Sequence, residues 1–489
     1  MEDAARRLER PLNPRSVVVV GDKSSTNYQW LHNLEHFTGR LSSVQIDERE
    51  IPGIEALGVT NYRSLRDVPG EIDLVISAVP RQVALRVLSD SIERGVGGIA
   101  YFTSGFAETG EPAAIEMQGR MTEMARAADL PIIGPNCMGV YNPRLGVRFN
   151  REQAHGQAGN VGFISQSGTH AMSFSLQSAA NGLRTSKAIS IGNSIILDAS
   201  DYLEYLAQDP ETEVIGMYLE GVKDGRRFVR VLRDTVATKA VLIWKGGRTE
   251  AGARATMSHT ASLATSSVVW EALRRQTGAI DAGNLDELLD ALKLLLLCKP
   301  ATGKRVALLA MTGGQSVVIT DAFASAGLEI PSLEARSYAE LAEFFNIIGG
   351  SYRNPFDMAG TINQAGQGGE EGNLERLLRI VDADPNIDAV AMEMSVMFGV
   401  RRWERDDRSF EQLLDTITAF RDRSPKPFLV IMHPAHMEAE AVRIRGRLQE
   451  RGLPVVPSFE RAALALRRVV DYRRFRAEMD PEREGARVD

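Results

Sequence analysis

The sequence predicts an α/β protein built from doubly wound parallel sheets. Short runs of Val and Ile alternate with helical patterns along the 489 residues, and most of these runs end in Gly or Pro. Parallel strands that are buried on both faces have this continuous apolar character. A chain of this length exceeds one ordinary hydrophobic core, so we expect several domains. Their predicted boundaries are 1–150, 151–299 and 300–472, followed by a charged tail at 473–489.

The first domain is expected to be Rossmann-like. Its strands are predicted in the runs SVVVVG, IDLVISAVP, GGIAYFTSG and PIIGPN, which start at Ser16, Ile72, Gly97 and Pro131. Helical patterns between the runs, such as residues 81–94, complete the strand–helix–strand alternation of a doubly wound sheet.

The second and third domains are predicted to be copies of one fold. The run VGFISQSGTHAMSFSLQSAANGL aligns without a gap with VALLAMTGGQSVVITDAFASAGL, so that Ser167 falls on Thr312. Further along, DPETEVIGMYLEG matches DPNIDAVAMEMSV, and KAVLIWK matches KPFLVIM. This repetition indicates duplication. A helix over 285–297 is expected to close the second domain, and 298–304 is expected to be a linker.

The two copies differ where chemistry would take place. Glu220 in the second domain falls on Ser395 in the third, and the segment that carries His259 has no counterpart. The second domain is therefore predicted to be the working copy.

Composition and charge exclude several classes of protein. The hydrophobic fraction of 44% and the charged fraction of 25% are typical of a soluble globular protein. The net charge of −7 gives no indication of nucleic-acid binding. No run is long enough to cross a membrane, and the N-terminus lacks the apolar region of a signal peptide. Two cysteines, Cys137 and Cys298, are too few for a disulfide framework and indicate a reducing compartment, so we expect a cytoplasmic protein.

A candidate anion site follows the first strand of the second domain. The strand is expected to end at Ser165, and a helix is expected to begin near Thr169. Free N–H groups at a helix start bind anions, and the hydroxyls of Ser167 and Thr169 add donors. An ordinary helix cap would use the same residue types. The patterns of a nucleophile elbow and of a P-loop are both absent.

The first domain has a weaker candidate site in the run GDKSSTNYQW. Gly21 occupies the position of a Rossmann turn, and the segment 24–26 has the residue types that cap a helix. The spacing G-x-G-x-x-G is absent, which gives dinucleotide binding little support. The carboxyl ends of the strands remain the expected place for a ligand.

The run KGGRTEAGARATMSHTASLA carries the most chemistry. Its glycines and small residues predict a mobile loop, and Arg248 and Arg254 supply charge suited to phosphate. A helix is expected to start near His259, and the positive end of a helix would lower the pKa of this imidazole and keep it nucleophilic. No second His or Cys stands at ligand spacing, so no metal site is expected. A histidine in an ordinary capping loop is the alternative.

Taken together, these stretches resemble the NDP-forming acyl-CoA synthetase family, which includes the succinyl-CoA synthetase α subunit and ADP-forming acetyl-CoA synthetases. The matching runs occur in family order over most of 15–297, and they are SAVP, TSGFAETG, IIGPNCMGVYNP, GNVGFISQSG, SIGN, DYLEYLAQDPETEVIGMYLEGVKDGRRF and the His259 run. The third domain, with GGQSVVITDAFASAGL and NPFDM, resembles the extra domain of the ADP-forming branch. The resemblance implies a CoA-binding Rossmann-like domain followed by two flavodoxin-like domains.

The resemblance also implies a role for each matched position. His259 corresponds to a transiently phosphorylated histidine, and Glu220 to a carboxylate that orients it. The positions expected to hold phosphate are Ser165, Ser167, Gly168 and Thr169, together with Arg248. The positions expected to line the coenzyme A site are Gly21, Ser24, Val79, Pro80, Ser104, Gly105, Phe106, Asn136 and Cys137.

In the reaction that the resemblance implies, acyl-CoA and phosphate give an acyl phosphate, which phosphorylates His259, and a swing of the loop then delivers the phosphate to ADP. The reverse direction uses ATP to make the thioester. No ATP-grasp pattern is found in the sequence, so ATP, ADP and Mg are expected on a separate ATP-grasp β subunit in a homo- or hetero-oligomer. Ala261 and Thr265 stand where the family usually has glycine, a departure that would stiffen the loop.

Two other functions are kept as alternatives. The departure of GDKSST from the family's usual first turn would suit a non-catalytic protein that binds CoA or acyl-CoA as a regulator or scaffold. An NAD-dependent oxidoreductase has less support, because the glycine fingerprint is missing.

Overall fold

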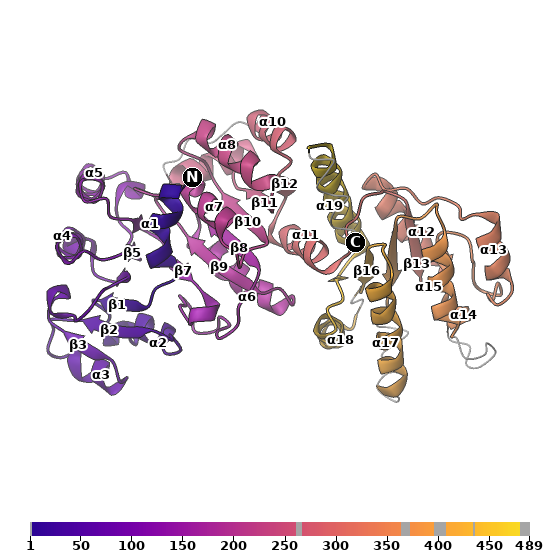
Figure 1. Ribbon diagram of the computed structural model, residues 1–489, viewed down its shortest axis with the longest axis horizontal. Coiled ribbons are helices and arrows are strands. Elements are labelled where there is room, and N and C mark those ends of the chain that lie inside the picture. Colours follow the sequence, from indigo (N-terminus) through magenta and orange to yellow (C-terminus); the bar gives the residue numbers. More distant parts are fainter. Residues whose placement is uncertain (1, 261–266, 363–371, 396–406, 434–435, 480–489) are drawn as a thin grey trace. The chain divides into compact units, whose positions relative to one another are not determined.

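A computed structural model of the chain describes residues 2–260, 267–362, 372–395, 407–433 and 436–479. The chain forms two compact units, Met1–Leu285 and Asp286–Asp489. Among the described residues, the N-terminal unit contains two six-stranded sheets and the C-terminal unit contains one five-stranded sheet (Figure 1). The fold class predicted from the sequence is confirmed.

The first sheet is parallel throughout and has the strand order β3-β2-β1-β4-β5-β6. Its strands are β1 (Ser16–Val20), β2 (Arg40–Val44), β3 (Thr60–Tyr62), β4 (Leu74–Ser77), β5 (Ile99–Tyr101) and β6 (Ile132–Ile133). Its helices are α1 (Glu2–Leu12), α2 (Gln29–Asn33), α3 (Ile51–Ala56), α4 (Ala84–Arg94) and α5 (Pro112–Ala127), with short 3-10 turns η1 (Ser24–Thr26), η2 (Leu65–Asp67), η3 (Arg81–Val83) and η4 (Ala107–Thr109). The order reverses between β1 and β4, and ligands bind at such a switch point.

The second sheet has the order β12-β11-β10-β8-β9-β7. Its strands are β7 (Gly139–Tyr141), β8 (Val161–Ser165), β9 (Thr185–Ser190), β10 (Val214–Leu219), β11 (Ala240–Lys245) and β12 (Ile280–Ala282). Its helical segments are η5 (Pro143–Leu145), α6 (Gly168–Ala180), α7 (Ala199–Gln208), α8 (Gly225–Val236), α9 (Glu250–Thr260) and α10 (Ser267–Thr277). Strand β7 comes from the predicted first domain and pairs antiparallel with β9, so the first domain contributes an edge strand to this sheet.

Helix α1 joins the two halves of the N-terminal unit. It lies beside α7 (Figure 1), and Tyr205 on α7 accepts a hydrogen bond from Asn13 at 2.8 Å and donates one to Glu9 at 3.3 Å. Asn142, just after β7, donates to the carbonyl of Leu12 at 2.9 Å. The two sheets therefore belong to one compact body, and side chains from both can form a single site.

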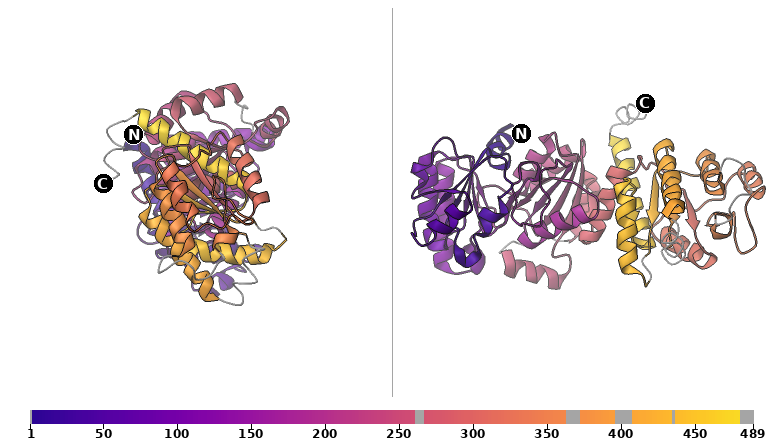
Figure 2. Two further views of the ribbon diagram at one scale, coloured as in Figure 1. Left: turned by 90° about the vertical axis from the view of Figure 1, so that its right-hand side faces the viewer. Right: turned by 90° about the horizontal axis from the view of Figure 1, so that it is seen from below.

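The C-terminal unit contains a parallel sheet with the order β14-β13-β15-β16-β17. Its strands are β13 (Val306–Ala310), β14 (Phe356–Asp357), β15 (Ala389–Glu393), β16 (Phe428–Ile431) and β17 (Val455–Val456). Its helices are α11 (Leu285–Leu297), α12 (Gly313–Ser325), α13 (Ala335–Ala342), α14 (Ala359–Ile362), α15 (Asn373–Ala383), α17 (Asp407–Arg423), α18 (Glu438–Glu450) and α19 (Phe459–Met479). Helix α19, yellow in Figure 2, lies beside α12 and contacts β16 and β17.

Helix α11 has the bounds predicted for it and is bonded to the C-terminal unit. Its buried Lys293 donates to the carbonyl of Val455 at 3.1 Å, and its Asp290 accepts from Arg461 of α19. These bonds group α11 with the C-terminal unit. Helix α19 continues to Met479, past the predicted domain end at 472, and the rest of the tail lies outside the described residues.

The predicted repeat is visible in the strand order. If β7 is set aside, the second sheet reads β9-β8-β10-β11-β12 and the third reads β14-β13-β15-β16-β17, so both follow the order 2-1-3-4-5. The first helices also match, because Ser167 caps α6 and Thr312 caps α12, each by accepting a backbone N–H at 3.3 Å. Within the described part of the chain, no helix is both long and apolar enough to cross a membrane.

Candidate functional site

The predicted phosphate turn lies between β8 and α6, at the carboxyl edge of the second sheet. Ser165 donates its hydroxyl to the carbonyl of Ser167 at 2.7 Å and accepts the Ser167 N–H at 3.1 Å. Ser167 caps the helix through the N–H of His170. Gly168 is the first residue of α6, and Thr169 follows it with an exposed side chain. The turn therefore places serine hydroxyls beside the backbone N–H groups at the start of a 13-residue helix.

Gln166 ties this turn to the loop that carries Glu220. Its amide oxygen accepts the N–H groups of Glu220 and Gly221, and its amide nitrogen donates to the carbonyl of Gly221 at 3.0 Å. Strands β8 and β10 are neighbours, with Ser165 opposite Tyr218, which brings the two loops side by side. One side chain thus fixes the backbone of the predicted carboxylate relative to the predicted phosphate turn.

Glu220 is buried, with 5% of its surface exposed, and its carboxylate and backbone have partners that the sequence does not predict. One of its oxygens accepts the Tyr218 hydroxyl at 3.2 Å, and its carbonyl accepts the ammonium of buried Lys245 at 2.8 Å. Burial lowers the pKa of Lys245, while the charge of Glu220 opposes that shift. A Cβ at Gly246 would lie 2.6 Å from the Tyr218 hydroxyl, so a glycine is needed there.

Three aromatic rings, which the sequence analysis missed, gather beside Glu220. His170, Tyr218 and Trp244 have ring centroids 4.3 to 4.6 Å apart. Burial lowers the pKa of His170, and the charge of Glu220 opposes the shift. The sequence signal for this cluster is that Tyr218 and Trp244 lie near the carboxyl ends of the neighbouring strands β10 and β11, and that His170 lies in the first turn of the helix after β8.

Arg248 and the segment around His259 differ from expectation. Arg248 forms a bidentate ion pair with Asp281 of β12, at 2.6 and 3.1 Å, so its charge is already compensated. The predicted mobile loop is wrong for residues 250–260, which form helix α9, because its alanines and other helix-forming residues outweigh its one glycine. His259 lies within α9, well after its start at Glu250, instead of at a helix start. The positive potential of a helix start, which falls off within the first turn, therefore does not reach His259 from α9.

The side chain of His259 lies outside the described residues, as do Ala261 and Thr265. The backbone of α9 nevertheless has a defined neighbour, because the helix lies against η4 of the first domain. The predicted phosphohistidine helix and the predicted CoA stretch TSGFAETG are thus in contact.

The predicted CoA residues gather at the carboxyl edge of the first sheet. Gly21 has a φ of +84°, and a Cβ there would lie 2.6 Å from Cγ1 of Val79, so β1 and β4 approach each other closely at the switch point. Pro80 follows Val79 and is the N-cap residue of η3. Only glycine permits this approach with this backbone conformation.

The run GDKSST is organised by two carboxylates. Buried Asp22 accepts the N–H groups of Trp30 and Leu31, both at 2.9 Å, and so caps α2. Ser24 lies in η1 and donates its N–H and its hydroxyl to Glu50, at 2.7 and 3.1 Å. The expectation that 24–26 caps the next helix is therefore wrong, because Asp22 takes that role.

Gly105 and Phe106 are held from within the chain. Their N–H groups donate to one oxygen of Glu108, at 2.6 and 3.1 Å. Phe106 is fully buried in the core of the first domain, whereas Ser104 is exposed. Gly105 and Phe106 therefore shape the edge of the sheet, and their amides are already used.

Asn136 and Cys137 connect the two halves of the N-terminal unit. Cys137 is buried, which raises the pKa of its thiol to about 12. The next residue, Met138, donates its N–H to Ser190 of β9 at 3.0 Å, and its Cγ would lie 3.0 Å from a Cβ placed at Gly168. The predicted CoA stretch thus adjoins the predicted phosphate turn.

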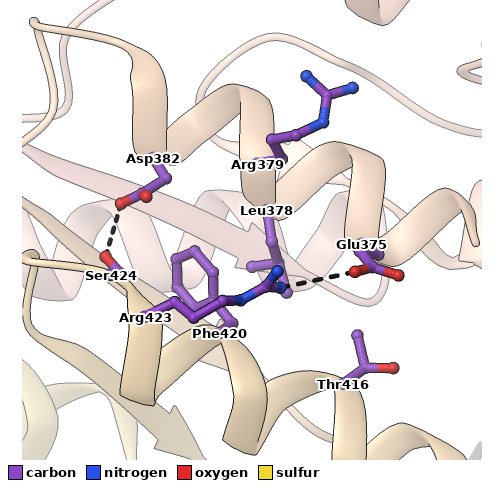
Figure 3. Close-up of a pocket in the computed structure, with 8 residues that line it drawn as sticks. All are labelled: Glu375, Leu378, Arg379, Asp382, Thr416, Phe420, Arg423 and Ser424. Atoms are coloured by element: carbon purple, nitrogen blue, oxygen red, sulfur yellow. Dashed lines mark hydrogen bonds and ion pairs between the residues drawn. The ribbon is translucent and has the colours of Figure 1, made fainter. Parts of the chain in front are cut away.

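Two cavities in the described residues lie away from the predicted site residues. One, of about 170 Å³, lies between α15 and α17 in the C-terminal unit, where Arg423 faces Glu375 and Ser424 donates to Asp382 (Figure 3). The other, of about 230 Å³, is lined by Arg6, Arg7 and Arg10 of α1. No group of three or more His, Cys, Asp or Glu that could hold a metal ion is found in the described part of the chain.

Comparison with known proteins gives matches to two family models. Residues 15–143 match a CoA binding domain, and residues 158–295 match the succinyl-CoA ligase like flavodoxin domain. Together these matches cover both sheets of the N-terminal unit.

Two curated relatives extend the similarity further along the chain. The acetate–CoA ligase [ADP-forming] II subunit alpha of Pyrococcus furiosus is 35% identical over 385 residues, covering 78% of this chain and 81% of that protein. The acetate–CoA ligase [ADP-forming] I subunit alpha of the same organism is 31% identical over 484 residues, covering 96% and 98%.

A solved structure agrees over nearly the whole length. The dinucleotide forming acetyl-coenzyme A synthetase 1 of Ca. Korarchaeum cryptofilum, in complex with phosphate and ADP, is 28% identical, covers 97% of this chain and 99% of that chain, and has a TM-score of 0.80. The chain therefore belongs to the ADP-forming acyl-CoA synthetase family and is similar to its α subunits.

Proposed function

We propose that this chain is the α subunit of an acid–thiol ligase that interconverts a carboxylic acid, CoA and ATP with acyl-CoA, ADP and phosphate. The contact between Met138 and Gly168 carries the proposal, because it sets the predicted CoA stretch against the predicted phosphate turn. The family membership supports a ligase, and the comparisons give no support to a non-catalytic scaffold.

The phosphate turn suits the first step. Phosphate attacks the thioester carbonyl, the C–S bond breaks, CoA leaves as a thiolate, and an acyl phosphate remains. The start of α6 and the Ser167 hydroxyl offer donors to the charged oxygens. The close approach of Gly21 to Val79 places two predicted CoA positions side by side at the switch point, which supports CoA binding there.

In the second step a neutral His259 nitrogen attacks the phosphoryl group, the carboxylate leaves, and the phosphohistidine then passes its phosphoryl group to ADP. Glu220 accepts the N–H of the other ring nitrogen, which leaves one nitrogen free to attack. Its fixed backbone, held by Gln166, supports this role. Arg248 takes part only if phosphate competes with Asp281 for its guanidinium.

A separate ATP-grasp subunit is part of the proposal. Two relatives that the chain covers at 81% and 98% of their lengths are named as α subunits, which supports a partner of this kind. A cytoplasmic location is also proposed, and the free state of Cys137 and Cys298 agrees with it.

The test is phosphorylation of the chain by γ-labelled ATP in the presence of the partner subunit. Wild-type protein is expected to gain acid-labile, base-stable label, and His259→Ala is expected to lose it. His155→Ala provides a matched control, because that histidine is exposed. His170→Gln checks the other histidine near Glu220, and it is expected to keep the label on His259. Label that persists in His259→Ala would refute the assignment.

A further inference from the structure

The loop after β9 contains an asparagine that the proposed reaction has not used. Its backbone is fixed by bonds of its own, because the Asn193 N–H donates to Pro135 O at 2.9 Å and the Ile195 N–H donates to Gly134 O at 3.2 Å. Lys223 donates to the Asn193 carbonyl at 3.2 Å. The loop is therefore held without the Asn193 side chain, which is free to serve another purpose.

The Asn193 side chain joins three segments of the predicted CoA edge. Its amide nitrogen donates to Glu108 at 2.6 Å and to Gln118 at 3.0 Å. Its amide oxygen accepts from Asn136 at 3.4 Å. Glu108 and Gln118 belong to the chain after β5, and Asn136 to the chain after β6, so one side chain from the second sheet holds two loops of the first.

Glu108 connects Asn193 to the predicted CoA loop, residues 103–106. The oxygen that does not face Asn193 accepts the N–H groups of Gly105 and Phe106. Gly105 has a φ of +96°, so these two successive N–H groups turn toward one carboxylate oxygen. Desolvation works against the charge of Glu108, but its hydrogen bonds outweigh that effect and lower its pKa, which keeps it a carboxylate.

The same place meets the helix that carries His259. Helix α9 lies against η4, and Glu108 is the middle residue of η4. Helix α9 thus packs against the turn that contains Glu108, whereas the Glu108 carboxylate itself is bonded to the CoA loop.

On the basis of the proposed function, we propose that Asn193 is a positioning residue for coenzyme A. It fixes Glu108, and Glu108 fixes the loop 103–106 at the carboxyl edge of the first sheet. We expect its effect on CoA binding and not on phosphorylation from ATP, because the Asn193 side chain bonds Asn136, Glu108 and Gln118, all of which belong to the first sheet's side of the unit and not to the phosphate turn.

The experiment uses the full chain with its partner subunit and three variants. Asn193→Ala removes the hydrogen bond that is donated to the Glu108 carboxylate. Because a hydrogen bond to a charged group contributes about tenfold or more, we expect the Kd for CoA to rise by about that factor. Asn193→Asp sets a second carboxylate against Glu108 and is expected to raise the KM and the Kd for CoA further. Glu108→Gln combined with Asn193→Asp restores a donor and an acceptor in exchanged places, so most of the CoA affinity is expected to return.

The internal control is labelling of His259 from γ-labelled ATP, which is expected to stay at the wild-type rate in all three variants. Asn181→Ala, at the exposed end of α6, is the matched asparagine control. The positioning role would be overturned if Asn193→Asp bound CoA as the wild type does. It would also be overturned if kcat fell with no change in the KM for CoA and the double variant did not recover. Failure of the wild-type protein to bind CoA would overturn the proposed function along with it, whereas normal wild-type binding isolates the test of Asn193.

Discussion

Replacing Gln166 by Leu should both destabilise the N-terminal unit and impair phosphoryl transfer. The leucine keeps the approximate size of the side chain but removes three hydrogen bonds, two accepted from the Glu220 and Gly221 N–H groups and one donated to the Gly221 carbonyl. Glu220 is buried, so its N–H would lose its partner where water has little access.

The size of the effect follows from those bonds. Each intramolecular hydrogen bond contributes about 0.5–1.5 kcal/mol, and Gln166 is itself only partly buried, so we expect a loss of about 2 kcal/mol. At about 2–4 °C per kcal/mol for a unit of this size, the Tm should fall by about 4–8 °C. Because the Glu220 backbone is no longer held, the rate of His259 labelling should fall as well.

Thermal unfolding and labelling from ATP measure the two effects on the same preparations. Gln177→Leu is the matched control, because Gln177 lies on α6 with an exposed side chain. The reasoning would be refuted if Gln166→Leu had the Tm and the labelling rate of the control.

Three further predictions follow from the site. Gly21→Ala should lower stability by about 1–3 kcal/mol in urea unfolding, because a φ of +84° is strained for alanine and the added Cβ meets Val79; a variant with wild-type stability would contradict the close approach. His170, whose pKa is lowered by burial against the pull of Glu220, binds a proton more readily in the unfolded chain, so stability should be lost as the pH falls from about 6.5. His170→Gln should reduce that loss between pH 7.5 and 5.5, and an unchanged slope would argue against it. Cys137, with a pKa of about 12, should resist iodoacetamide at pH 8 in the folded protein and react after denaturation, as followed by mass spectrometry.

Much of the fold is predictable from the sequence because buried parallel strands leave a local signature. The five residues of β1 are all buried, and so are the five of β8, and both appear as continuous apolar runs. The cap at Ser167 is local as well, since an N-cap depends on residues within one turn. By contrast, the three residues of β7 have no such signature, and their place in the second sheet depends on pairing with β9.

The candidate site is less predictable because its side chains acquire partners from distant segments. The sequence predicts that the charge of Arg248 is available to phosphate, but the Asp281 that neutralises it comes close when β12 pairs with β11. Asp22 caps α2 from a position several residues before the helix begins, so no local capping pattern marks it. The small residues of the His259 segment predict a loop, but its alanines favour the helix that forms.

A comparison of the two copies separates the features that stabilise the fold from those at the proposed site. Lys239 donates to the carbonyls of Leu206 and Asp209, at 2.9 and 2.6 Å. Its counterpart Lys426 donates to those of Val381 and Asp384, at 3.1 and 2.7 Å, so the repeat preserves this brace at the amino ends of the strands.

At the carboxyl edge the copies diverge. At the position that corresponds to the proposed phosphate turn of the second domain, buried Glu393 accepts the N–H of Met311 at 2.8 Å, and Asp357 accepts a backbone hydrogen bond from Gly313. Burial raises the pKa of both carboxyl groups, and another negative charge beside them would raise it further. An incoming phosphate would meet carboxylates and amides that are already bonded, so the start of α12 is less suited to phosphate than the proposed site at the start of α6. The third domain thus has the strand order of the second, and its own carboxylates lie at the position of the proposed phosphate turn.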